Sequence, residues 1–209
     1  SFITTDKFVE AAVPILQGMI PAYTVCSHCE FDVSIDLMLL LAQAYQTLGD
    51  LDNAQLAYQQ TITEIISAKN MAIRAGGMDF LVKYKMIEPL EGRSWQVTWE
   101  DGSGAIFTPT LGSRKIGLIG MNPFGLELVE SAILTQLNVR LSNAYAGLAK
   151  LMEFLKRSNK AYELLQEAQR LDEGIENWHN LGATCNDLGN LVRQLEAFQA
   201  ARTYYHQAL

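Results

Sequence analysis

Two stretches of this chain repeat one another, and this repetition constrains the fold more than any other feature of the sequence. LLLAQAYQTLGDLDNAQLAYQQTI starts at Leu39, and WHNLGATCNDLGNLVRQLEAFQAA starts at Trp178. Both combine a large apolar residue, a Leu followed by a small residue, a Gly before a turn, and then an aromatic and a small residue. In the first stretch these positions are Met38, Leu41, Ala42, Tyr45, Gly49, Ala54, Tyr58 and Thr61. In the second they are Trp178, Leu181, Gly182, Cys185, Gly189, Gln194, Phe198 and Ala201.

A third series lies between these two stretches and has Lys156 in place of the turn glycine. Its members are Tyr145, Leu148, Ala149, Met152, Ala161, Leu165 and Ala168. Small residues let two helices approach closely, Leu and aromatic side chains fill the space between them, and Gly permits a tight turn. The pattern therefore predicts pairs of antiparallel helices. Because one such hairpin cannot bury its apolar face alone, the hairpins are expected to stack.

The pattern resembles the tetratricopeptide repeat family, whose unit of about 34 residues is a pair of antiparallel helices. The resemblance covers residues 35–68 and 142–208, which is about half of the chain. It implies a solenoid of stacked helical hairpins. Upstream, DKFVEAAVPILQGMI has apolar residues at helical spacing, with Pro14 interrupting it, and predicts a helix that packs on the first hairpin.

The segment between the hairpins has a different character. SWQVTWEDGSGAIFTPTLGSRKIGLIGM predicts two or three short strands separated by turns, with Trp95, Val97 and Trp99 on one face. The predicted fold class is therefore mainly α, a tetratricopeptide-like helical-hairpin solenoid with a small antiparallel β insert. Residues 1–92 would hold N-terminal helices with one hairpin, 93–122 the insert, and 123–209 the C-terminal hairpins. We expect one continuous domain that is a fragment of a longer chain.

The stretch KIGLIGMNPFG, from Lys115, has the strand and glycine with which a dinucleotide site begins. Such a site needs three glycines, a helix, and then a second strand that ends in an acidic residue. Here Asn122 stands in the second glycine position, and Arg140 stands about twenty residues on, inside a helix-like run. We therefore predict no cofactor, and interpret Asn122-Pro123 as the opening of a helix.

Charge and hydropathy exclude further classes of function. A net charge of −7 and a pI near 5.0 argue against nucleic-acid binding. No apolar run is long enough to span a bilayer, and we expect a cytoplasmic location. A mean hydropathy of +0.04 is high for a solenoid, whose surface is large for its volume. We therefore expect a concentration-dependent homodimer.

Metal-binding and catalytic patterns are weak in this sequence. Cys26 and Cys29, in CSHC, supply half of a zinc site, and no second CxxC follows them. Cys185 and His179 could complete the site only if the fold brought them close. The three histidines have no companion motif, and GxSxG, HExxH and phosphate-loop patterns are missing from the sequence. We predict ordinary thiols, no metal, and no catalysis by this part of the chain.

The predicted function is that of a protein-protein interaction scaffold. In the resembling family, the concave face made by the first helix of each hairpin binds peptides. The resemblance implies that this face carries polar residues suited to a polar or extended peptide: Gln43, Gln46, Asn143, Lys150, His179, Asn180 and Asn186.

Two other hypotheses belong to different classes of function. In one, the segment is a regulatory or substrate-recruiting region of a larger enzyme whose catalytic domain lies outside these residues. In the other, it is a small-molecule receptor in which the insert surface, Trp95 and Trp99, floors a pocket.

Overall fold

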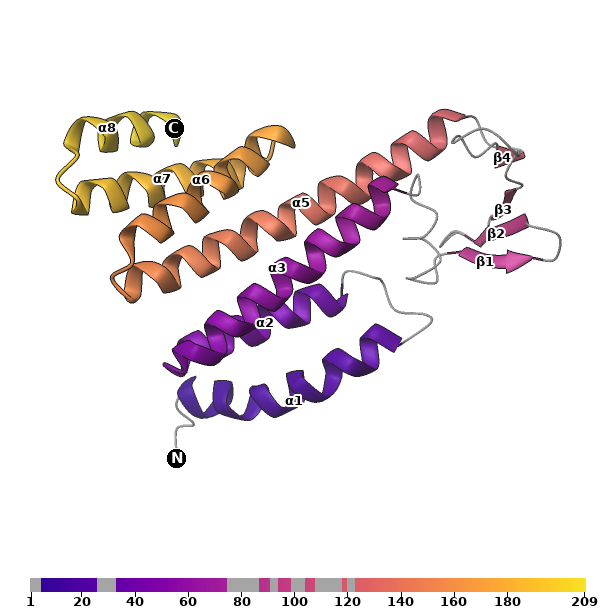
Figure 1. The fold of residues 1–209 in the computed structure, drawn as a ribbon, viewed down its shortest axis with the longest axis horizontal. Helices are drawn as coiled ribbons and strands as arrows, with labels where there is room; N and C mark the ends of the chain where they lie inside the picture. The colour runs from indigo at the N-terminus through magenta and orange to yellow at the C-terminus, as the bar shows by residue number, and fades with distance from the viewer. Residues whose placement is uncertain are drawn as a thin grey trace. The chain divides into compact units, whose positions relative to one another are not determined.

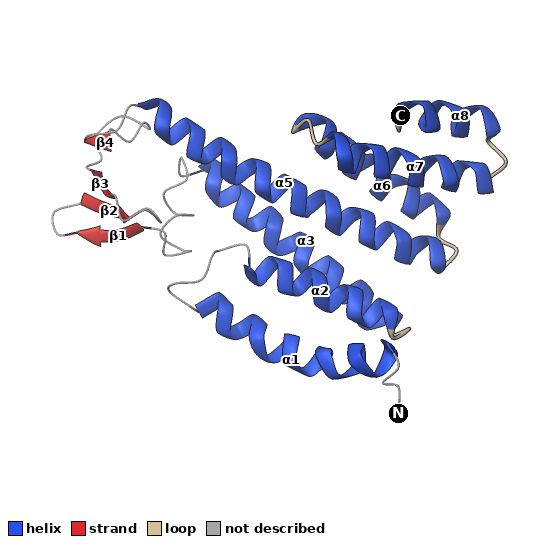
Figure 2. Ribbon diagram, turned by 180° about the vertical axis from the view of Figure 1, so that it is seen from behind, coloured by secondary structure: helices blue, strands red, loops and turns tan. Residues whose placement is uncertain are grey.

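The structure is a computed structural model, and it describes the backbone of residues 5–25, 33–74, 87–90, 94–98, 104–107, 118–119 and 123–209. The side chains are described for residues 7–21, 33–70 and 134–209. Helices account for most of these residues (Figures 1 and 2). The chain divides into two units. One consists of Ser1–Val25, Asp32–Ile65 and Asn138–Leu209, and the other of Cys26–Phe31 and Ile66–Leu137. The packing described below lies within the first unit.

The first unit is built from helices joined by very short turns. The helices are α1 (Thr5–Val25), α2 (Val33–Thr47), α3 (Leu51–Arg74), α5 (Pro123–Phe154), α6 (Ser158–Gly174), α7 (Trp178–Gln194) and α8 (Phe198–Gln207). Of these, residues 66–74 of α3 and 123–137 of α5 belong to the second unit. Three-residue turns, drawn in tan in Figure 2, connect α2 to α3 and each of α5, α6 and α7 to the next helix. In addition, α1 packs on α2, α6 on α7 and α7 on α8. The predicted helix start at Asn122-Pro123 is confirmed, whereas α1 runs through Pro14 without interruption.

Helix α6 shows why these segments fold as amphipathic helices. Its buried apolar residues recur at helical spacing: Ala161, Leu164, Leu165, Ala168 and Leu171. Residues three and four apart lie on one face of a helix, so these side chains form a single apolar stripe. Its exposed charged residues, such as Lys160 and Glu163, lie elsewhere on the helix, whereas one acidic residue, Asp172, is buried. The stripe packs toward α7 and the core of the first unit.

Each turn has a residue with left-handed backbone at its centre. These residues are Gly49 (φ 75°), Lys156 (φ 59°), Glu176 (φ 55°) and Glu196 (φ 62°). In the second turn, the N–H of Lys156 donates to the carbonyl of Glu153 at 2.9 Å, and the N–H of Arg157 donates to the carbonyl of Met152 at 2.8 Å. The other three turns repeat this pair of bonds. It is the Schellman arrangement, which satisfies the last carbonyls of a helix while reversing the chain.

The turn residues place three hairpins in one register. Gly49, Lys156 and Glu196 mark the turns of α2–α3, α5–α6 and α7–α8. Five residues after each of them stands a buried alanine: Ala54, Ala161 and Ala201. Seven residues before each of them stands a buried small residue: Ala42, Ala149 and Gly189. The second and third hairpins are therefore 40 residues apart, longer than the 34-residue unit expected from the sequence.

This register corrects the predicted role of Gly189. Gly189 does not lie at a turn; it is inside α7, and the turn follows at Leu195–Ala197. In the sequence-based alignment, Leu181-Gly182 stood in the position that Leu188-Gly189 holds in the structure. The displacement of seven residues has a physical reason: two helical turns bring the same face of a helix back to the core, so both registers satisfy the apolar pattern.

Two glycines inside helices allow aromatic rings to lie directly against the backbone. A Cβ atom at Gly147 would lie 2.5 Å from the ring of Tyr58, and one at Gly189 would lie 2.5 Å from the ring of Tyr205. Tyr58 is only 1% exposed and is among the largest fully buried side chains of the described residues. The contact with Gly147 therefore fixes how closely α5 approaches α3.

Between α3 and α5 the backbone contains four short paired segments. They are β1 (Ile87–Leu90), β2 (Ser94–Thr98), β3 (Gly104–Phe107) and β4 (Leu118–Ile119). Each pairs antiparallel with the next, in the order β1-β2-β3-β4. Gln96, for example, stands opposite Glu88 on one side and Ile106 on the other. The side chains of these segments lie outside the described residues.

The predicted fold class requires a correction at this point. Throughout the residues with described side chains, the fold is all-helical and contains no strand, so the small antiparallel β insert is not supported and that part of the prediction is wrong. The physical reason is that alternating Trp, Val and Thr residues express a local preference for extended chain. A sheet becomes a component of a fold only when one of its faces packs, and the core described here is made by helices alone.

Replacing the left-handed lysine is predicted to stabilise the first unit. Lys156→Gly should raise the free energy of unfolding by roughly 0.5–1 kcal/mol, because Gly adopts positive φ without a steric penalty. Urea denaturation followed by circular dichroism measures the change. As a control, Glu163→Gly on the exposed face of α6 should lower the same quantity by about 0.5–1 kcal/mol. A lower denaturation midpoint for Lys156→Gly would contradict the turn geometry.

Filling the space at Gly147 is predicted to have the opposite effect. Gly147→Ala should destabilise the protein by roughly 1–3 kcal/mol, because its methyl group would overlap the buried Tyr58 ring. Gly18→Ala in α1 is the control, since a Cβ there meets nothing within 4 Å; it should be neutral or stabilise by up to about 1 kcal/mol. Thermal unfolding of the two variants separates the cases, and equal shifts would show that Tyr58 does not pack on Gly147.

Candidate partner-binding surface

The first helices of the three hairpins are joined by polar contacts that recur in one register. The Arg140 guanidinium of α5 donates from Nε and Nη2 to the two carboxylate oxygens of Asp36 in α2, each at 3.0 Å. One hairpin further, Asn180 Nδ2 of α7 donates to Asn143 Oδ1 of α5 at 3.1 Å. Asp36 and Asn143 stand thirteen residues before their turn residues, and Arg140 and Asn180 stand sixteen before theirs. The same two positions therefore contact each other between the first and second hairpins and between the second and third.

Two further contacts join α5 to α7. Lys150 Nζ forms an ion pair with Asp187 Oδ2 at 3.3 Å, and Gln194 Nε2 donates to Glu153 Oε1 at 2.6 Å. Together with Asn143 and Asn180 these residues make a row of polar contacts along the two helices. We call the exposed side of α2, of α5 from residue 138 onward, and of α7 the first-helix surface. Its charges are largely balanced within the row, so it presents mainly hydrogen-bonding groups.

The residues predicted to bind a partner fall into two groups. Four of them take part in contacts within the first unit: Asn143 and Asn180 bond to each other, Lys150 pairs with Asp187, and Gln46 accepts a hydrogen bond from the Tyr58 hydroxyl at 3.1 Å. Gln43, His179 and Asn186 have exposed side chains. Their role in binding stays a prediction. Trp95, Trp99 and the CSHC segment lie outside the residues with described side chains.

The sequence analysis includes Lys150 but misses the other charged members of this surface, which are Asp36, Arg140, Glu153 and Asp187. It also misses the amide of Gln194. The signal that identifies them is their position relative to the turns, because Asp36 matches Asn143 and Arg140 matches Asn180. That signal became readable only when Lys156 and Glu196 were recognised as turn residues, since neither is the glycine that marks such a turn in sequence.

Beneath the first-helix surface, a buried carboxyl joins three helices. Asp172 of α6 is 0% exposed. Its Oδ2 accepts hydrogen bonds from Ser142 Oγ of α5 at 2.7 Å and from Thr184 Oγ1 of α7 at 3.4 Å. Asn177 Nδ2, in the next turn, donates to Oδ1 at 3.4 Å. Burial raises the pKa of Asp172 above its usual value, and the hydrogen bonds from Ser142, Thr184 and Asn177 lower it in part.

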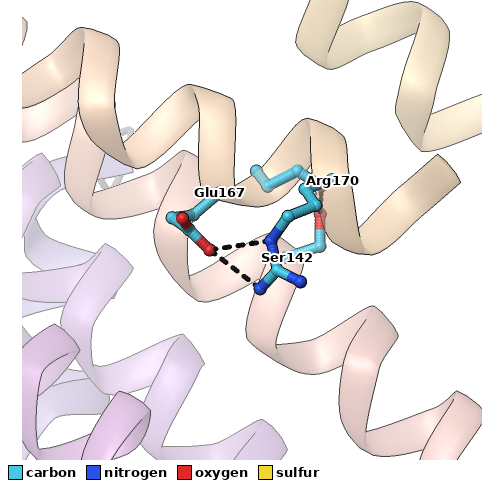
Figure 3. Close-up of polar contacts among 4 residues, drawn as sticks. Ser142, Glu167 and Arg170 are labelled. Atoms are coloured by element: carbon cyan, nitrogen blue, oxygen red, sulfur yellow. Dashed lines mark hydrogen bonds and ion pairs between the residues drawn. The ribbon is translucent and has the colours of Figure 1, made fainter. Parts of the chain in front are cut away.

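Close to this carboxyl, an exposed ion pair lies on the same helix. The Arg170 guanidinium donates to Glu167 Oε2 from Nε at 3.2 Å and from Nη2 at 2.9 Å, as Figure 3 shows beside Ser142. Burial raises the pKa of the nearby Tyr145, the negative charge of Glu167 raises it further, and the positive charge of Arg170 lowers it. Tyr145 therefore stays a neutral phenol near neutral pH. Burial likewise raises the pKa of Tyr58 to about 12, so its hydroxyl remains a donor to Gln46.

Metal binding and membrane spanning can both be assessed in the part of the chain that the structure describes. Among these residues there is no group of three or more His, Cys, Asp or Glu side chains that could hold a metal. Cys185 is a buried free thiol, and burial raises its pKa. Within the described ranges, none of the helices has both the length and the apolar composition needed to cross a membrane.

Three hairpins in a common register define a helical repeat protein. Residues 35–63, which cover α2, the first turn and the start of α3, match the family model of the tetratricopeptide repeat. Over these residues the resemblance to the tetratricopeptide repeat family noted in the sequence is confirmed. Proteins of this family are generally non-catalytic scaffolds that mediate protein-protein interaction. A comparison with curated proteins finds no match.

The buried carboxyl generates a prediction about pH. Because the pKa of Asp172 is raised in the folded state, folding favours its protonated form, and its contribution to stability declines as pH rises from the unfolded value of 3.8 through the folded pKa. Asp172→Asn removes this titration while keeping the side-chain shape. The free energy of unfolding of Asp172→Asn minus that of the parent should therefore increase as the pH rises from about 4 to about 7. Urea denaturation of both proteins across this range measures the difference. A difference that does not change with pH would contradict the assignment.

Proposed function

We propose that this chain is an interaction scaffold that binds an extended, polar segment of a partner protein along the first-helix surface. The single observation that carries the proposal is the recurrence of the Asp36–Arg140 contact at Asn143–Asn180. A contact repeated in register holds successive first helices side by side. The partner would therefore meet a row of side chains whose positions are set before it binds, which lowers the ordering cost on the scaffold's side.

The chemistry of the row favours hydrogen bonding over charge. The Asp36–Arg140 and Lys150–Asp187 pairs balance their charges, and Gln43 and Asn186 offer exposed amides. Amide side chains both donate and accept, so they suit the peptide groups of an extended segment. A net charge of −7 also supports a protein partner over a nucleic acid. Lys150 is the most accessible cation of the row, because its side chain is 60% exposed despite its ion pair.

A matched pair of lysines tests the proposal. Lys150 on the first-helix surface and Lys160 on α6 each form an ion pair with an acid, at 3.3 and 3.0 Å, and both side chains are 60% exposed. Changing either lysine to glutamate alters the net charge by the same amount and places the new carboxylate beside an acidic side chain. The two variants should therefore be similarly stable. Only the first lies on the proposed binding surface.

The experiment selects peptides from a random displayed library against the parent chain and measures their affinity by fluorescence anisotropy. We expect Lys150→Glu to lower the affinity for the selected peptides by about tenfold or more. Lys160→Glu should change the same affinity by less than about twofold. Gln43→Ala should also weaken them, because it removes an exposed amide from the α2 end of the row. Equal affinities for the parent and Lys150→Glu, with both proteins folded by circular dichroism, would refute the first-helix surface as the binding site.

A further inference from the structure

Each ion pair of the first-helix surface exposes one of its two members much more than the other. In the Asp36–Arg140 pair, the carboxylate side chain is 50% exposed and the guanidinium side chain 16%. In the Lys150–Asp187 pair the order is reversed, because the ammonium side chain is 60% exposed and the carboxylate side chain 28%. Each pair is therefore neutral in sum, but the first presents an acid to solvent and the second presents a base.

The two ion pairs occupy different positions in the register of the hairpins. Asp36 and Arg140 stand thirteen and sixteen residues before their turn residues, and they join α2 to α5. Lys150 and Asp187 stand six and nine residues before theirs, and they join α5 to α7. The exposed base therefore lies nearer to the turns than the exposed acid does, and it lies one helix further along the stack.

The two remaining combinations of these positions are neutral. Between α5 and α7, the positions thirteen and sixteen residues before the turns hold Asn143 and Asn180, which bond to each other through their amides. Between α2 and α5, the positions six and nine residues before the turns hold Gln43 and Gly147. The exposed acid and the exposed base thus lie diagonally across the surface, and the other two corners carry amides or no side chain.

The separation of the two charges sets the length of chain that can reach both. Asp36 contacts Arg140, which is ten residues from Lys150 on α5, or about 15 Å along the helix axis. Crossing from one side of α5 to the other adds a sideways step of about 8–10 Å, so roughly 17 Å separates the two charges. An extended chain advances about 3.3 Å per residue. With the reach of its side chains, such a chain spans this separation in about four to six residues.

We propose that the partner segment carries one basic and one acidic side chain about four to six residues apart, the basic one bound at Asp36 and the acidic one at Lys150. This inference rests on the function proposed above and specifies the chemistry of the partner. Arg140 and Asp187 hold the two exposed charges in place before the partner binds. A segment with two like charges would meet repulsion at one of the two sites, so the surface selects against strongly acidic and strongly basic segments.

The peptides selected from the displayed library against the parent chain provide the probe. We expect basic and acidic residues to be enriched together in them at this spacing. In one selected peptide, each of the two charged residues is changed to Gln, and the protein is changed at Asp36→Asn or Lys150→Gln. Fluorescence anisotropy then gives four double-mutant cycles. Lys150→Gln should couple with the acidic peptide residue by about threefold or more, and Asp36→Asn with the basic one by a similar factor. The two crossed combinations should couple by less than about 1.5-fold.

The outcomes separate this inference from the proposed function. Peptides whose affinity depends on Lys150 but which lack the paired opposite charges, or cycles in which matched and crossed combinations couple equally, would overturn the charge pattern and leave the proposed function standing. A library that gives no peptide dependent on Lys150 would overturn both. Lys160→Gln on α6 is the matched control and should couple with neither peptide residue. Circular dichroism checks that each variant is folded, and the changes made in the peptide test the pattern on the unaltered protein.

Discussion

The left-handed residue at the centre of each three-residue turn is the constraint on which the rest of the first unit depends. A turn this short leaves consecutive helices little freedom to slide, since both Schellman bonds must form at its ends. Three of the four positions are occupied by Lys or Glu, which adopt this backbone at a cost of the order of 1 kcal/mol or more. The conformation persists because the helices on both sides pack too well to permit another. Tertiary packing thus imposes the turn, and the turn in return fixes the register.

The contacts that join the hairpins follow from this register. Asp36 reaches Arg140 and Asn143 reaches Asn180 because each pair occupies the same positions relative to its turns. The chemistry of the two contacts differs, one being an ion pair and the other a bond between amides. The positions of the contacting residues are repeated, because the backbone turns set them, whereas the residue types differ from one repeat to the next. Hairpins with different sequences can therefore stack in the same way.

Much of the fold could be predicted from the sequence, and the errors have identifiable physical causes. Helical hairpins, the family and the helix start at Pro123 could be predicted, because apolar periodicity and proline placement are local signals. The position of Gly189 was wrong, since a 40-residue spacing and a 34-residue expectation differ by about two helical turns and leave the same face buried. The β insert was wrong because extended-chain preference does not reveal whether a face will pack. The Arg140 contact was missed because it joins residues 104 positions apart, which no local pattern encodes.

The register of the hairpins also determines how charged side chains are used within the stack. Between successive hairpins, the side chains of one meet those of the next, so carboxylates and cations become internal pairs, as Lys150 and Asp187 do. Glu153 is used inside the stack to accept a bond from Gln194, whereas its equivalent Arg193 can only donate. One repeated position can therefore exchange an acceptor for a donor while the helical packing is preserved.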